Sequence, residues 1–183
     1  MKIGKLVTRV VIGGLFVGHG TQKLFGWFDG PGLDTTAEGF ESMGLRPGRR
    51  HAMAAGAAET AGGVMVAAGF ITPVAVSMLS GVMLTAIRKV HLKNGPWVTK
   101  GGYEYNLVLL AALMALADDG PGSPSLDRRL GIEKRGAGWA LAALAAGAAG
   151  SQLAVSSPKW QAEQPAETVG DAQSQHETER RAA

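Results

Sequence analysis

The sequence "AMAAGAAETAGGVMVAAGFITPVAVSMLSGVMLTAI", residues 52–87, decides the fold, because only one of its side chains, that of Glu59, is charged. A second stretch, "GAGWALAALAAGAAGSQLAV" at residues 136–155, has no charged side chain. A buried Ala-rich helix of a soluble protein normally keeps a polar stripe, whereas these stretches are apolar on every face. Apolar stretches of about 18 residues or more can cross a bilayer. The sequence therefore predicts an integral membrane protein rather than a soluble helical one.

The same pattern predicts an all-α fold, with a four-helix membrane bundle and a fifth transmembrane helix. Pro73 suits the start of the third span, directly after a tight connection. The fourth span is short, about 22 Å at 1.5 Å per residue. It needs Tyr103 and Tyr105 as interfacial anchors or a locally thinner bilayer. The expected spans are residues 6–28, 52–70, 73–90, 103–117 and 136–155.

The predicted domain organisation follows these spans. The bundle takes residues 1–131 and the additional helix takes residues 132–155. Residues 156–183 are rich in Gln, Glu, Ala and Ser without apolar periodicity, so we predict a disordered polar tail. Pairs of small residues four apart, Gly14 with Gly18 and Ala143 with Gly147, are compatible with close helix packing.

The charged side chains inside the predicted spans gather at one membrane face. If the first four spans run up and down, the ends of the first and third meet the starts of the second and fourth there. His19, Gln22 and Lys23 share one helical face through their i+3 and i+4 spacing. The other polar candidates at this face are Glu59, Arg88, His91, Tyr103 and Glu104.

Glu59 needs a partner if it is ionised, because an isolated charge in a membrane span costs at least about 2.5–3.5 kcal/mol. His19, Lys23 and Arg88 are the candidate partners. Two interpretations of Glu59 stay open, a structural ion pair and part of a functional site. Lys23 also has a simpler interpretation, in which its side chain snorkels to the headgroups.

Several chemistries are excluded or disfavoured by composition. The chain has no Cys, which excludes a thiol relay and any iron–sulfur cluster that it would ligate itself. Zinc and phosphate-loop motifs are absent, so no metal site is predicted. The pI of 9.4 comes from interfacial charges, which disfavours nucleic acid as a partner. Haem is disfavoured because only His19 and His91, on different helices, could be its axial ligands.

Three motifs carry a family resemblance: "GHGTQKLFGWF" (18–28), "AAETAGG" (57–63) and "HLKNGPWVTKGGYEYNL" (91–107). With them, the chain resembles the DoxX family of bacterial membrane proteins from about residue 5 to residue 131. The resemblance implies a four-helix membrane bundle associated with quinone-linked redox systems and with partner enzymes. The span 136–155 and the polar tail lie outside it. The positions that match the family pattern are His19, Gln22, Lys23, Glu59, His91, Lys93, Asn94, Gly95, Gly102, Tyr103, Glu104 and Tyr105.

The resulting functional hypothesis is a redox-associated membrane subunit whose buried polar site binds a quinone or a small lipophilic substrate. His19 and Lys23 would hydrogen-bond a carbonyl oxygen, and Glu59 would relay a proton. The electrons would come from a soluble or membrane partner protein or from a cofactor that the sequence does not identify. Whether the chain is itself an enzyme, an oxidoreductase subunit using quinone, stays open. The other expected ligand-binding residues are Gln22, Arg88, His91, Tyr103 and Glu104.

Two alternatives belong to other classes. One is a non-catalytic membrane scaffold that recruits partner enzymes, and the other is a small-molecule transporter, for which five helices without inverted repeats are poor material. We expect a multi-pass protein of the bacterial cytoplasmic (inner) membrane. Lys and Arg outside the spans number seven on each side, so they do not orient it. A cytoplasmic N-terminus follows if Arg88 and some lysines are tied up in the polar cluster.

Overall fold

The computed structural model describes residues 3–156, which are helical with no strand. Residues 157–183 of the predicted polar tail lie outside that range. A π-helical turn, Ile87–His91, and two short 3-10 turns, Leu92–Asn94 and Val98–Lys100, follow α4. The α-helices are α1 (Ile3–Phe25), α2 (Gly32–Ser42), α3 (Gly48–Ala68), α4 (Thr72–Ala86), α5 (Glu104–Asp119), α6 (Leu126–Arg129) and α7 (Ala137–Ser156).

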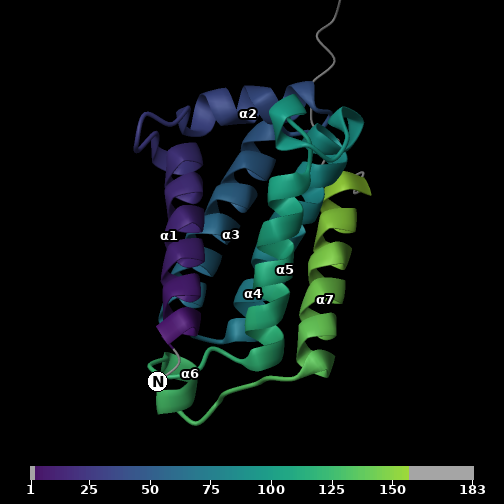
Figure 1. Ribbon diagram of the computed structural model, residues 1–183. Helices are drawn as coiled ribbons and strands as arrows, with labels where there is room; N and C mark the ends of the chain where they lie inside the picture. Colours follow the sequence, from purple (N-terminus) through teal and green to yellow (C-terminus); the bar gives the residue numbers. More distant parts are fainter. Residues whose placement is uncertain (1–2, 157–183) are drawn as a thin grey trace, which may run out of the picture.

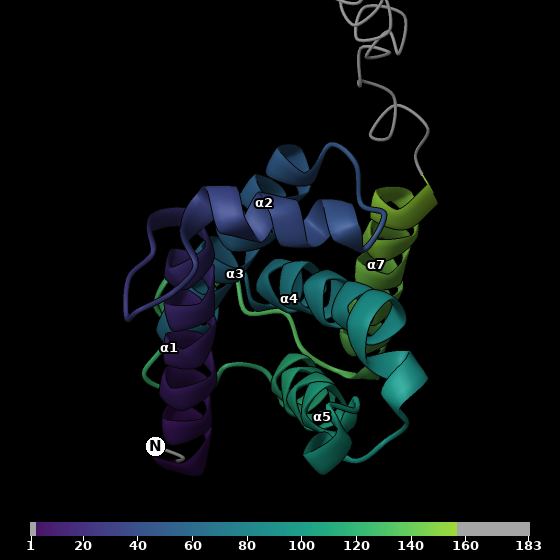
Figure 2. The ribbon, with the colours of Figure 1, turned by 90° about the horizontal axis from the view of Figure 1, so that it is seen from above.

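Five helices run up and down, and the sixth long one, α2, lies across one end of them (Figure 1). Helix α1 packs on α3, α3 packs on α4, and α4 contacts both α5 and α7. Figure 2 shows α2 crossing over the bundle from the side of α1 toward α7. This all-helical bundle confirms the predicted fold class, and each predicted span corresponds to one long helix within a few residues.

Three helices are long and apolar enough to cross a membrane: Ile3–Phe25, Thr72–Asn94 and Ala137–Ser156. Helix α5 has 16 residues and is too short for that criterion, as its short predicted span suggested. Helix α3 carries His51 and Glu59 among its Ala and Gly residues, which lowers its hydropathy. Helix α3 packs against α1, α2 and α4, and α5 packs against α4 and α7.

Helix α2 was not predicted, because it lies in the connection between the predicted spans 6–28 and 52–70. It is amphipathic: Leu33, Thr36, Ala37 and Phe40 face the bundle at i, i+3, i+4 and i+7, and the intervening positions are more exposed. Asp34 in its first turn is placed favourably for the helix dipole. An 11-residue helix is too short for a membrane span, and it lies across the bundle end instead.

Glycines bring α1 and α3 into backbone contact. A Cβ added to Gly13 would lie 2.5 Å from the carbonyl oxygen of Gly63, and one added to Gly20 would lie 2.6 Å from that of Gly56. Gly14, by contrast, has no neighbour within 4 Å, and neither has Gly18, so this predicted pair does not pack. The reason is rotation about the axis of α1, which spacing alone does not determine. The pair on α7 does face a helix, because Ala143 is buried and Gly147 packs against Gly81 of α4.

The end of the bundle opposite α2 is fastened by Asp127 of α6. Its carboxylate accepts hydrogen bonds from the backbone N–H of Ile71 at 2.6 Å, and from the N–H and hydroxyl of Thr72 at 3.0 and 2.8 Å. Arg9 of α1 is buried beside it and donates to the carbonyl oxygen of Pro124. Arg9 is therefore a packed structural residue.

Candidate functional site

An ion pair between α1 and α3 forms the centre of the site. Lys23 Nζ lies 2.7 Å from Glu59 Oε2, and the Glu59 side chain is only 4% exposed against 23% for Lys23. The glycine contact at Gly20 and Gly56 makes this distance possible, because it removes the side chains that would hold the two helices apart. Glu59 is therefore a buried carboxylate with a cation beside it, and Lys23 does not snorkel.

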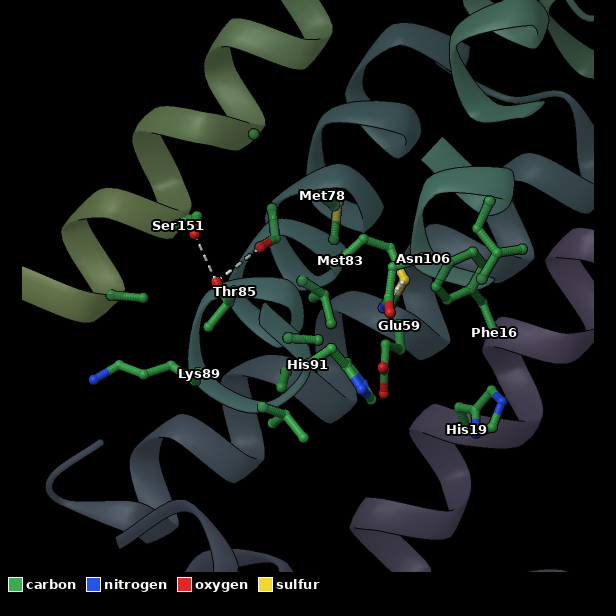
Figure 3. Close-up of a pocket in the computed structure, with 18 of the residues that line it drawn as sticks. Phe16, His19, Glu59, Met78, Met83, Thr85, Lys89, His91, Asn106 and Ser151 are labelled. Atoms are coloured by element: carbon green, nitrogen blue, oxygen red, sulfur yellow. Dashed lines mark hydrogen bonds between the residues drawn. The ribbon is translucent and has the colours of Figure 1, made fainter. Parts of the chain in front are cut away.

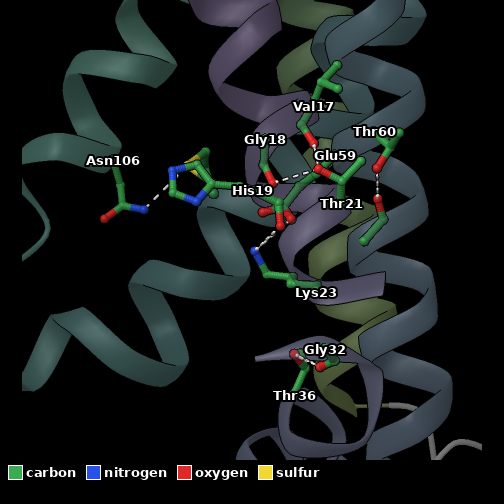
Figure 4. A network of polar contacts seen from close by, with 12 residues as sticks. Val17, Gly18, His19, Thr21, Lys23, Gly32, Thr36, Glu59, Thr60 and Asn106 are labelled. Atoms are coloured by element: carbon green, nitrogen blue, oxygen red, sulfur yellow. Dashed lines mark hydrogen bonds and ion pairs between the residues drawn. The ribbon is translucent and has the colours of Figure 1, made fainter. Parts of the chain in front are cut away.

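His19 lies one helical turn before Lys23 and completes the cluster (Figure 4). Its ring lies close enough to Glu59 for an electrostatic interaction, and its backbone carbonyl accepts a hydrogen bond of 3.4 Å from Lys23 Nζ. The structure thus brings together Glu59, His19 and Lys23, the three side chains expected to converge. Their i+4 spacing on one helix and the packing of that helix on α3 are sufficient to explain it.

A cavity of about 710 Å³ adjoins this cluster. His19, Lys23, Glu59 and His91 all line it, while α2 and the loop after it supply part of its wall through Phe40, Met43 and Leu45. Most of the remaining lining is apolar, including Leu15, Phe16, Met78, Val82 and Leu109. A volume in this range, with a few polar groups on an apolar wall, is typical of a small-molecule site.

Two further polar side chains of the wall come from α5 and from the π-helical turn after α4. Asn106 of α5 is buried and donates from its amide nitrogen to Met83 Sδ at 3.4 Å. His91 Nδ1 lies 2.7 Å from the carbonyl oxygen of Gly101. Because a carbonyl only accepts, Nδ1 is the donor, which leaves Nε2 as an acceptor in the neutral ring. Figure 3 shows Asn106, His91 and Glu59 around the cavity.

Comparison with known proteins identifies the family. A model of the DoxX family matches residues 4–92. The chain is also 31% identical over 115 residues to a Bacillus subtilis (strain 168) protein named "Putative oxidoreductase CatD", a match that covers 63% of this chain and 79% of that protein. The chain belongs to the DoxX family. No solved structure matches it.

Four residues that were expected in the DoxX site do not line the cavity. Gln22 donates to the carbonyl oxygen of Phe28 at 3.4 Å and holds the loop after α1. Glu104 accepts a 3.0 Å hydrogen bond from the backbone N–H of Val98. Tyr103 precedes α5, and the next tyrosine, Tyr105, reaches the cavity instead. The fourth is Arg88, which is exposed.

The π-helical turn Ile87–His91 separates His91, which lines the cavity, from Arg88, which does not. In an α-helix Arg88 and His91 would share a face. Hydrogen bonds in a π-helix run from i to i+5, so each turn holds more residues and side chains three apart no longer align. The sequence offers no local signal for this turn, since it contains neither Gly nor Pro.

Asn106 was also missed as a site residue of this DoxX chain. It belongs to the third family motif, and it occupies a single polar position on the otherwise apolar face of α5, which is the signal that could have found it. Within residues 3–156, no three His, Asp or Glu side chains gather closely enough to hold a metal ion.

Proposed function

We propose that this DoxX protein is a redox-associated membrane subunit whose cavity binds the headgroup of a quinone or a similar small lipophilic molecule. The observation that carries the proposal is the buried Lys23–Glu59 ion pair in the wall of a mostly apolar cavity. An ionised pair away from water costs desolvation energy, and a functional site is the usual reason for keeping one in a membrane segment.

The chemistry of the wall suits a quinone carbonyl. The Lys23 ammonium and the His19 ring can donate hydrogen bonds to a carbonyl oxygen, and the apolar lining suits a ring and its isoprenoid chain. Reduction adds two electrons and two protons, which convert the two carbonyls to two hydroxyls. Lys23 and His19 would supply the protons, and Glu59 would pass replacements to them.

The electrons would come from a partner protein that carries a flavin or an iron–sulfur cluster. The chain has no Cys to ligate such a cluster itself. An oxidoreductase assignment in the name of the Bacillus subtilis relative supports this redox setting, because the relative aligns over most of its length. A soluble or membrane-bound redox partner is therefore part of the proposal.

The test uses the full chain in phosphatidylcholine nanodiscs, with menaquinone-4 and ubiquinone-1 as probes and tryptophan quenching as the signal. We expect one of these quinones to bind the wild type, and Lys23→Met to weaken its binding by about tenfold or more through the lost charged hydrogen bond. Lys93→Met, which removes the same charge outside the cavity, is the matched control. Failure of both quinones to bind the wild type would overturn the proposal.

A membrane scaffold is the second candidate, and a specific observation favours it. The Lys23–Glu59 pair joins α1 to α3 and could serve helix register alone. The double variant Lys23→Met with Glu59→Gln separates the two functions. A folded double variant that no longer binds quinone supports the site, whereas loss of the folded bundle with no quinone binding in the wild type supports the scaffold.

The membrane setting belongs to the same proposal. We place the chain in the bacterial inner membrane as a multi-pass protein with five crossings and a cytoplasmic N-terminus. In that orientation the cavity and α2 lie toward the outer side. Helices α1 and α7, at opposite ends of the chain, both satisfy the length and apolarity of a span. A reporter test of the orientation is given in the Discussion.

A further inference from the structure

Lys89 is a second cation in the cavity wall, and the function proposed above does not use it. It lies in the π-helical turn after α4, is half-buried, and lines the cavity. Figure 3 shows its side chain on the side of Thr85 and Ser151, across the cavity from Glu59 and His19.

No carboxylate neutralises Lys89 in the part of the chain from residue 3 to residue 156. The side chain forms no ion pair within 4.0 Å there, and its Nζ donates one long hydrogen bond, 3.4 Å, to the carbonyl oxygen of Met43. An ammonium has three donors, so two of them are left for another acceptor. Met43 belongs to the loop after α2, so this hydrogen bond connects the Lys89 side chain to that loop.

The surroundings of Lys89 are basic and neutral. His51 at the start of α3 lies close enough for the Lys89 charge to act on it. The hydroxyls of Thr85 and Ser151 are hydrogen-bonded to each other at 2.9 Å. Among the described residues that line the cavity, Glu59 is the single carboxylate, and its charge is offset by Lys23. With neutral histidines, these lining residues carry one positive charge in excess, at Lys89.

Helices α4 and α7 both contribute apolar residues to the cavity wall. Met78, Val82 and Ala86 of α4 line the cavity together with the small residues Ala146 and Gly150 of α7. A chain of methylene groups could pack there while its polar end reaches Lys89. The expected ligand thus has an apolar body and one anionic end.

We propose that the cavity binds a lipophilic anion, a molecule with an apolar chain and a single carboxylate or phosphate group, and that Lys89 is the counter-ion for this group. The inference rests on the cavity being a ligand site, as in the proposed function. It names the class of ligand that would bind at the Lys89 side of that cavity. The anion could be a free long-chain carboxylate or an anionic membrane lipid, which share the charge and the apolar chain.

The experiment measures energy transfer from tryptophan to cis-parinaric acid in nanodiscs of neutral phosphatidylcholine, with parinaric acid methyl ester as the uncharged probe. Lys89→Met is expected to weaken binding of the acid by about tenfold or more, the effect of one lost charged hydrogen bond, and to leave the ester unchanged. Lys89→Arg keeps the charge and should retain most of the affinity for the acid.

Lys93→Met is the matched control, because Lys93 is exposed, four residues away, and outside the cavity wall. Equal weakening in Lys93→Met and Lys89→Met would mean general attraction to a basic surface and would overturn the proposal. Unchanged affinity of Lys89→Met for the acid would do the same. Thermal unfolding of each variant, together with the ester arm, reveals a variant that has lost its fold.

Two further measurements are needed. One distinguishes a membrane lipid from a free carboxylate, and the other separates this proposal from the quinone proposal. Displacement of parinaric acid by phosphatidylglycerol assigns the site to an anionic membrane lipid, and absence of displacement assigns it to a free carboxylate. Glu59→Gln should impair quinone binding and leave the preference for the acid over the ester. If no quinone binds but the Lys89-dependent preference holds, the quinone proposal falls and the lipophilic anion stands.

Discussion

Glu59 is the one charged residue in the apolar part of α3, residues 52–68, and its position depends on one neighbour. Lys23 lies 2.7 Å away, and the Glu59 carboxylate is almost fully buried. Removing one member of a buried pair leaves the other charge without compensation, which costs more than removing both. At the residue scale, the site and the stability of the bundle are therefore coupled through this pair.

This coupling gives the first prediction. Lys23→Met alone should destabilise the protein by about 3 kcal/mol, because Glu59 then stays buried without its cation. The double variant Lys23→Met with Glu59→Gln should be destabilised less than Lys23→Met alone, since the uncompensated charge is gone. Thermal unfolding in one mild detergent measures both. Equal unfolding midpoints for the single and double variants would show that the two side chains are not coupled.

At the scale of elements, the approach of α1 to α3 positions the cluster. Two neighbouring glycines on α1 differ in what surrounds them. Gly13 faces the backbone of α3, whereas Gly14 faces open space. The close approach is therefore confined to one side of α1. Lys23 follows Gly20 on this helix by three residues, and its side chain reaches Glu59 of α3.

The second prediction uses these two glycines as a matched pair. Gly13→Ala should destabilise the bundle by about 1–3 kcal/mol, because its Cβ would lie 2.5 Å from the carbonyl oxygen of Gly63 and force the helices apart. Gly14→Ala should leave stability unchanged or raise it slightly, since Ala is the better helix former. Thermal unfolding compares the two. A similar loss of stability in both variants would contradict the close approach at Gly13.

At the scale of the whole molecule, the two ends of the bundle have different tasks. The end under α2 contains the cavity and the polar site. The other end is closed by Asp127, whose carboxylate binds the connection between α3 and α4, and by the buried Arg9 of α1. Segments far apart in the sequence are thus fixed at one end, and the ligand cavity opens at the other.

The third prediction concerns this closed end. Asp127→Asn should destabilise the protein by about 2–3 kcal/mol, since the amide replaces a charged acceptor of three hydrogen bonds beside Arg9. Asp119→Asn is the control, because Asp119 is exposed and pairs with Lys5 at 3.3 Å, an arrangement worth little. Thermal unfolding of both variants is the measurement. An unchanged unfolding midpoint for Asp127→Asn would mean that this end is held by packing alone.

The fourth prediction is the orientation of the chain. The two ends of the described chain, at α1 and α7, lie at opposite ends of the bundle (Figure 1). Alkaline phosphatase fused after Ser156 should therefore be active, and green fluorescent protein at the same site should be dark, if the N-terminus is cytoplasmic. The reverse result would mean that the chain has the opposite orientation, with the cavity toward the cytoplasm.

The sequence alone determined the all-helical membrane fold, the approximate bounds of five long helices, the family, and the meeting of His19, Lys23 and Glu59. Hydropathy and helical periodicity are local properties, and short connections between long helices leave few arrangements for residues at their ends. These features could therefore be predicted without coordinates.

Tertiary structure decided the rest. The rotation of α1 selected Gly13 over Gly14, the π-helical turn separated Arg88 from His91, and packing brought Asn106 to the cavity. It also laid α2 across the bundle end, where it forms part of the cavity wall. The physical reason is that a cavity is the space left between helices, so its shape depends on axial rotations and side-chain volumes that no single segment encodes.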